Sequence, residues 1–146
     1  MTTRTDVILV QDFSNIRREA KASGTITPGM LVELEAAGTV KAHASAGGFA
    51  AKTFAIRGIL QGNGIDDDYS ANDLVSYHHL NAGDRVLSIL AENQTIVIGD
   101  YLESAGDGKL RKYTSGVRLA MATEAKNTTA ASSDDEVDYR CIVEIV

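Results

Sequence analysis

The sequence predicts a mainly β protein that folds as one compact domain, a β-barrel or a β-sandwich. Two observations carry this expectation. One hairpin layout occurs twice at a constant spacing, over residues 26–41 and again over residues 96–111. A short phrase, in which Asp follows a residue that tolerates a positive φ angle and precedes an apolar run, occurs at three places: Asn72-Asp73, Gly83-Asp84 and Gly99-Asp100. Both patterns indicate many short strands separated by tight turns.

The two hairpin segments match position by position. Gly29 and Gly38 correspond to Gly99 and Gly108, and Glu33 corresponds to Glu103. We interpret this match as two strand pairs with equivalent places in the fold. The alternative is that unrelated glycine-bounded hairpins share the layout, because hairpins with alternating side chains have few possible forms.

Composition restricts the possible functions. The chain has 146 residues, 44% of them apolar but only 5% aromatic, so aliphatic side chains must build its core. A net charge of −6 argues against a nucleic-acid partner, which would need a basic surface. No apolar run approaches membrane-spanning length, so we expect no membrane partner. A single cysteine excludes an internal disulfide and fits a reducing cytoplasm, where we expect the product to remain.

The N-terminal residues 1–24 form either an arm or a first strand region, and residues 25–146 form the β-domain. Residues 7–10 are apolar without alternation, which suits a strand of the domain or an arm that pairs with another molecule. Residues 12–23 allow a short helix capped by Ser14 or an extended chain. The sequence leaves both choices open.

The remaining strands follow from apolar runs bounded by turn residues. We expect them at residues 53–60, 74–80, 86–90, 117–123 and 139–146. Between the first two of these runs lies a turn-rich segment, in which Ile65 and Tyr69 are the expected core anchors. The last run alternates from Tyr139 to Ile145, so one face of the closing strand should be buried.

The acidic run 66–68 is the first candidate for a metal site. Calcium loops need acids at alternate positions and a distal Glu, and this run has neither. A solvated acidic turn is the better interpretation. We therefore expect no metal and no cofactor.

Histidine and cysteine provide no catalytic pattern either. His78 and His79 are adjacent on a predicted strand and point to opposite faces, and His43 has no partner at ligand spacing. We interpret all three as surface histidines, and Cys141 as a buried, inert thiol. No catalytic residue stands out, so we expect a binding or structural module rather than an enzyme.

Several turn motifs in a fixed order support a family resemblance. They are Gly62-x-Gly64-Ile65-Asp66-Asp67-x-Tyr69, then Gly83-Asp84-x-Val86, then Ile98-Gly99-Asp100-x-Leu102-Glu103-Ser104-Ala105-Gly106-Asp107-Gly108, with Val40-Lys41-Ala42-His43 and Gly47-Gly48 upstream. Over about residues 26–146 the chain resembles the head decoration (cement) proteins of tailed phages. Asn72 stands where the family pattern has Gly, but Asn also tolerates the left-handed region.

The resemblance implies a structural virion protein, made in the host cytoplasm and bound to the outer surface of the expanded phage head. Its partner would be the major capsid protein, whose subunit contacts it would stabilise, and many such proteins are homotrimers on the capsid. No catalysis, cofactor, nucleic acid or membrane is implied. An extended N-terminal segment could add a strand to a sheet edge of the capsid, so the candidate contact residues are Asp6, Val7, Ile8, Leu9 and Val10.

A second class of function is a carbohydrate- or cell-surface-binding β-module, carried on a virion or secreted. Sugar-binding sites usually expose aromatic rings for stacking. This chain has no Trp, and its five tyrosines lie mostly in strand patterns. The resemblance to decoration proteins is therefore the better guide.

Overall fold

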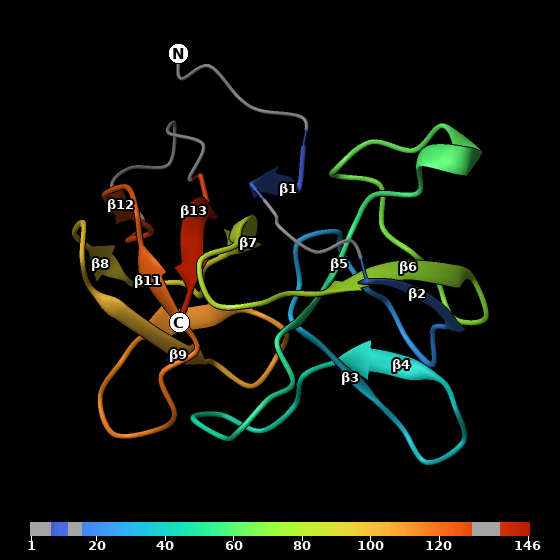
Figure 1. Ribbon diagram of the computed structural model, residues 1–146, viewed down its shortest axis with the longest axis horizontal. Helices are drawn as coiled ribbons and strands as arrows, with labels where there is room; N and C mark the ends of the chain where they lie inside the picture. Colours follow the sequence, from blue (N-terminus) through green and yellow to red (C-terminus); the bar gives the residue numbers. More distant parts are fainter. Residues whose placement is uncertain (1–6, 12–15, 130–137) are drawn as a thin grey trace.

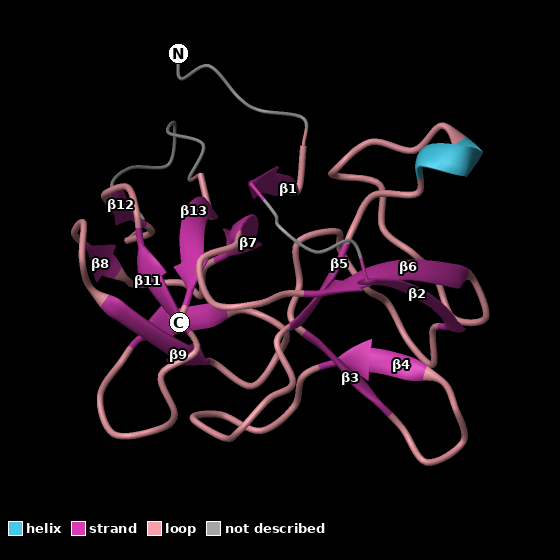
Figure 2. Ribbon diagram, viewed as in Figure 1, coloured by secondary structure: helices cyan, strands magenta, loops and turns pink. Residues whose placement is uncertain are grey.

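Antiparallel strands make up nearly all the regular structure of the computed structural model, which describes residues 7–11, 16–129 and 138–146 (Figures 1 and 2). The one helical element among these residues is a three-residue 3₁₀ turn, η1 (Ile59–Gln61). The prediction of a mainly β domain is therefore confirmed. None of the sheets formed by the described residues closes into a barrel, but single bridges join the outer strands of each repeat at one end, Ala22 with Val40 and Leu90 with Leu110.

The two halves of the chain repeat one arrangement of five strands. In the first repeat (residues 16–80) the spatial order is β2 (Ile16–Lys21), β6 (Leu74–His79), β5 (Thr53–Ala55), β3 (Val32–Leu34) and β4 (Val40–Ala42). In the second repeat (residues 84–146) the order is β7 (Arg85–Ile89), β13 (Arg140–Ile145), β11 (Ala120–Ala122), β9 (Tyr101–Ser104) and β10 (Leu110–Lys112). The equivalent strands follow each other in the same sequence order within each half.

The hairpin predicted to occur twice is present in both repeats with the same register. Glu33 lies opposite Lys41 in the first hairpin, and Glu103 lies opposite Arg111 in the second. The equivalence extends beyond the hairpins, because matching backbone hydrogen bonds connect the other strands. Examples are Ala22 N to Asp73 O (2.9 Å) with Leu90 N to Tyr139 O (2.7 Å), and Ala55 N to Met30 O (3.0 Å) with Ala122 N to Asp100 O (2.8 Å).

The repeated Gly/Asn-Asp phrase forms the same turn at each of its three positions. Asn72, Gly83 and Gly99 all have positive φ angles, of 72°, 97° and 93°. In each turn the Asp carboxylate accepts a hydrogen bond from the backbone N–H three residues earlier, at 2.8, 2.8 and 3.0 Å. The turn therefore tolerates Asn in place of Gly, as the sequence suggested.

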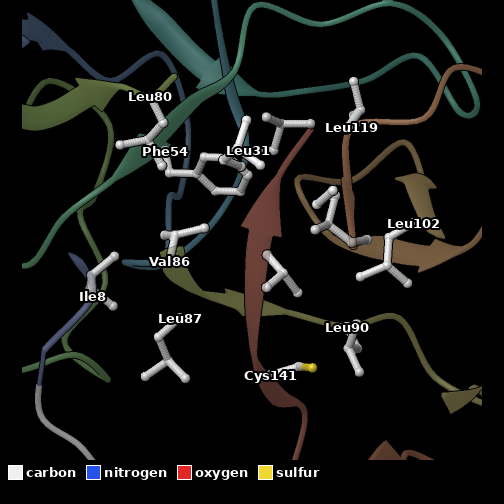
Figure 3. Packing of buried hydrophobic residues seen from close by; sticks show 14 of the residues in the cluster. Ile8, Leu31, Phe54, Leu80, Val86, Leu87, Leu90, Leu102, Leu119 and Cys141 are labelled. Carbon is white, nitrogen blue, oxygen red and sulfur yellow. The ribbon is translucent and has the colours of Figure 1, made fainter. Parts of the chain in front are cut away.

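The main apolar core lies between the two repeats and belongs to both. Leu31, Phe54 and Leu80 of the first repeat pack into the same cluster as Val86 and Leu102 of the second (Figure 3). A smaller cluster lies within the first repeat, around Ile26, Tyr69 and Val75. Because the repeats share their main core, the chain forms one domain.

The remaining elements complete the second repeat. The short strand β1 (Leu9–Gln11) pairs with β7 in antiparallel fashion, and β8 (Thr95–Ile96) pairs with β12 (Lys126–Asn127). The expectation of a strand over residues 53–60 is only partly correct, because β5 ends at Ala55 and the chain then turns through η1. For residues 12–23, the extended alternative holds from Ile16 to Lys21, where β2 pairs with β6.

Candidate interaction surfaces

The N-terminal segment proposed for partner contact is an edge strand of the domain. The backbone N–H of Leu87 on β7 donates to the carbonyl of Ile8 at 2.7 Å. Ile8 is 2% exposed and belongs to the main core (Figure 3). Leu9 packs against that core. Val7 and Val10 are 50% and 42% exposed. Of the proposed contact residues, Val10 on β1 and Val7 just before it can therefore reach a partner while β1 stays paired with β7. Asp6 lies outside the described residues.

The strand β2 forms the opposite kind of edge, open and charged. It is the terminal strand of its sheet, with β6 on one side (Figure 1). On the other side, among the described residues, only its C-terminal end is covered, where Ala22 bridges Val40 of β4. Its burial pattern is exposed at every position except the partly buried Ala20. Sequence patterning did not identify this edge, because the charges of residues 16–21 suit a helix face equally well.

An arginine–tyrosine stack lies at the surface of the second repeat. The guanidinium of Arg118 lies 4.9 Å from the ring centroid of Tyr101 and 4.7 Å from that of Tyr113. Arginine over an aromatic face is attracted by the ring quadrupole. The sequence did not single out Arg118, although a hairpin through residues 101–113 indicates that the two tyrosines lie close. Each ring thus already has a guanidinium near it, which leaves less ring surface for a sugar.

A polar cluster connects the two hairpins in the interior. His43 Nδ1 lies 2.7 Å from the hydroxyl of Ser104, and His43 Nε2 lies 3.1 Å from the carbonyl of Phe49 and 3.7 Å from Glu33 Oε2. These groups include the side-chain types of a hydrolase triad, but both Ser104 and His43 are buried. A nucleophile must reach its substrate, so this geometry describes a buried contact between repeats.

The interpretation of all three histidines as surface residues is wrong. His43 and His78 are buried, and only His79 is partly exposed. His43 can be buried because both of its ring nitrogens have partners away from water: the hydroxyl of Ser104, 61 residues away, and the carbonyl of Phe49, six residues away.

A buried carboxylate holds the loop that follows β10. Glu103 Oε1 accepts hydrogen bonds from the N–H and the hydroxyl of Thr114, at 2.6 and 2.9 Å, and Oε2 lies 3.5 Å from Arg111. Burial raises the pKa of Glu103. The hydrogen bonds from Thr114 and the charge of Arg111 together lower it by more, so the pKa of Glu103 lies below its ordinary value. Gly47 and Gly116 lie against this carboxylate, where a Cβ atom would collide with it.

The other residues considered for chemistry form no reactive site in the described part of the chain. No group of three His, Cys, Asp or Glu side chains able to hold a metal lies within it. Cys141 is buried, as expected, and burial raises the pKa of its thiol to about 12. Nor does any helix among the described residues have the length and apolar character to cross a membrane.

The fold is thus an internally duplicated, open antiparallel β-domain with two unlike edges and a buried polar contact between its hairpins. The chain matches no model of a known protein family, and no curated protein matches it. Its structure is similar to the crystal structure of the head fiber gp8.5 N base in bacteriophage phi29, with a TM-score of 0.58 and 13% sequence identity. The match covers 91% of this chain and 95% of that chain, so the two share a fold over nearly their whole lengths.

Proposed function

We propose that this chain is a structural protein of the phage virion that binds the outer surface of the expanded head and stabilises contacts between major capsid protein subunits. The observation that carries the proposal is the shared fold with a head fiber base over 91% of the chain. The ordered turn motifs of the sequence support the same class. The proposed role involves no catalytic step and no cofactor, and the chain would be synthesised in the host cytoplasm.

The electrostatics of the chain fit a protein partner. Its net charge of −6 would repel packaged DNA and other anionic polymers, so the proposal includes no nucleic-acid contact. The surface nevertheless exposes apolar and aromatic side chains of the kind found in protein interfaces, including Phe49, Tyr101 and Ile98. These features support capsid protein as the partner.

Co-sedimentation with expanded heads that lack this protein tests the proposal. The purified chain should bind them and saturate at a fixed number of copies per head, and the filled heads should survive heat better than empty ones. Unexpanded heads are the control for specificity. Absence of binding to expanded heads would overturn the proposal, and a glycan array would then test the carbohydrate-binding alternative.

The proposal also includes a homotrimer on the capsid. Light scattering of the free protein measures whether the trimer exists before binding. The copy number at saturation measures it on the head, where trimers require a multiple of three per binding position. A copy number of one per position would contradict the trimer and leave the head-binding role intact.

The N-terminal contact needs point variants rather than deletion of the segment. Because Ile8 is part of the main core, removing residues 7–10 would lower stability as well as remove the contact. Val7→Asp combined with Val10→Asp places charges only on exposed positions. This variant should keep its melting temperature and bind heads at least about tenfold more weakly. Unchanged binding would exclude these residues from the contact.

A further inference from the structure

The two repeats have equivalent outer strands, β2 and β7, which differ in what covers them. On β7 the chain's own strand β1 is added, with Leu9 opposite Val86 and the Leu87 N–H bonded to the Ile8 carbonyl (Figure 1). On β2 no described strand is added along residues 17–19, and β4 covers only the C-terminal end, where the Ser23 N–H donates to the Val40 carbonyl at 3.0 Å. An uncovered edge presents a row of backbone donors and acceptors that can template a further strand.

The backbone groups that face outward from β2 follow from its hydrogen bonds. The N–H of Ala22 points toward β6, because it donates to the carbonyl of Asp73 at 2.9 Å. Successive residues of an antiparallel strand alternate in direction. The main-chain groups of Arg17, Glu19 and Lys21 therefore point away from β6.

The second repeat shows the same alternation with its edge occupied. There the N–H of Leu90 points inward to Tyr139, and the N–H of Leu87, three residues earlier, points outward to β1. Glu19 is the residue of β2 equivalent to Leu87. The β2 edge thus offers an N–H at the position where the β7 edge already donates to an added strand.

The side chains of the β2 edge indicate the charge of the segment that fits it. Arg17 lies 2.8 Å from Glu19, so these two charges compensate each other. Arg18 and Lys21 are exposed and leave the edge net positive in a chain of net charge −6. Because they lie on opposite faces of the strand, an added segment would meet positive charge on both of its faces.

The same charges disfavour a second copy of this chain as the occupant. In the antiparallel register centred on Glu19, Glu19 would lie opposite Glu19 of the second copy, and Arg17 would lie opposite its Lys21. Like charges directly opposite each other destabilise a strand pair. An acidic segment of another protein avoids both conflicts.

We propose that the outer edge of β2 binds an extended, acidic segment of the major capsid protein as an added antiparallel strand. The identity of the partner rests on the function proposed above. In this arrangement the chain covers one edge itself, with β1 on β7, and leaves the equivalent edge at Arg17 and Glu19 for its partner.

A proline at the edge tests the main-chain contact. Glu19→Pro removes a single N–H that faces away from β6, and edge strands accept proline at such positions. Glu19→Ala is the matched control, because it removes the same side chain and keeps the N–H. In head titrations the proline variant should bind at least about tenfold more weakly than the alanine variant, at an unchanged melting temperature.

Charge reversal and hydrogen exchange provide independent measurements. The double variant Arg18→Glu, Lys21→Glu should lose at least about tenfold in affinity for heads. The control is the double variant Lys109→Glu, Lys112→Glu, which makes the same change in net charge on the other repeat. In the wild-type protein, amides of residues 16–22 should exchange more slowly when heads are bound. The exchange measurement decides the question if the proline variant proves unstable.

The outcomes separate this inference from the proposed function. If the wild-type protein does not bind heads, the proposed function fails, and the partner named here fails with it. If the wild-type protein binds but the β2 variants bind equally well and exchange at residues 16–22 is unchanged, the edge proposal alone is overturned. Dimers of the free protein that Glu19→Pro abolishes would also overturn it, because β2 would then bind a second copy.

Discussion

The substitution Arg140→Met tests whether one buried guanidinium stabilises the junction between the repeats. Arg140, at the start of β13, is 8% exposed; it donates to the carbonyls of Pro28 at 2.8 Å and Ile65 at 2.6 Å. A hydrogen bond to a charged group contributes about 1.5–3 kcal/mol, and methionine leaves both buried carbonyls without this donor. The guanidinium no longer has to be desolvated, which offsets part of the loss, so we expect a net destabilisation of about 3 kcal/mol.

Urea unfolding with an unchanged m-value measures this effect, and the melting temperature should fall by roughly 6–12 °C for a chain of this size. The matched control is Arg85→Met on the neighbouring strand. Arg85 has a side chain 42% exposed and one ion pair, to Glu144 at 3.3 Å, so its loss should cost less than about 1 kcal/mol. If the two variants are destabilised equally, the buried contacts of Arg140 do not stabilise the junction.

Three further predictions follow from burial and pKa. Ile8→Ala should destabilise the protein by about 2–4 kcal/mol in urea, and Val10→Ser by less than about 0.5 kcal/mol; equal effects would contradict the assignment of Ile8 to the core. The pKa of Glu103 is lower in the folded protein than in the unfolded chain. The ionised Glu103 side chain therefore stabilises the folded protein fully above the unfolded pKa, and this stabilisation is lost as pH falls through the folded pKa. Glu103→Gln should therefore show a smaller loss of melting temperature below about pH 5 than the wild type, and parallel curves would refute this. Cys141, with its pKa raised to about 12, should not react with a thiol reagent at about pH 8 unless urea is added, and rapid labelling of the native protein would contradict its burial.

Turn chemistry made much of the fold predictable. The Asp73, Asp84 and Asp100 turns depend on residues adjacent in sequence, so their pattern can be read directly. The hairpin repeat was also visible, because Gly29 and Gly99 both need a positive φ angle and so resist replacement. Local constraints of this kind leave a signal in the sequence itself.

The full duplication was not predictable, because it is preserved in backbone pairing rather than in side chains. The strand β2 reads IRREAK and is exposed, whereas its equivalent β7 reads RVLSI and is mostly buried. Loops of different length between the strands also change the spacing of equivalent residues from one strand pair to the next. The burial of His43 was missed for a related reason, since its partner Ser104 is 61 residues away.

The core that both repeats share also bears on the order in which the chain can fold during synthesis. All five strands of the first repeat are complete by residue 80, so their pairing can begin before the second repeat has been made. Leu31, Phe54 and Leu80, however, pack against residues that the ribosome adds later, such as Val86 and Leu102. Until those residues are added, the nascent chain exposes apolar surface, and β1 stays unpaired until β7, which lies far C-terminal to it, has been synthesised.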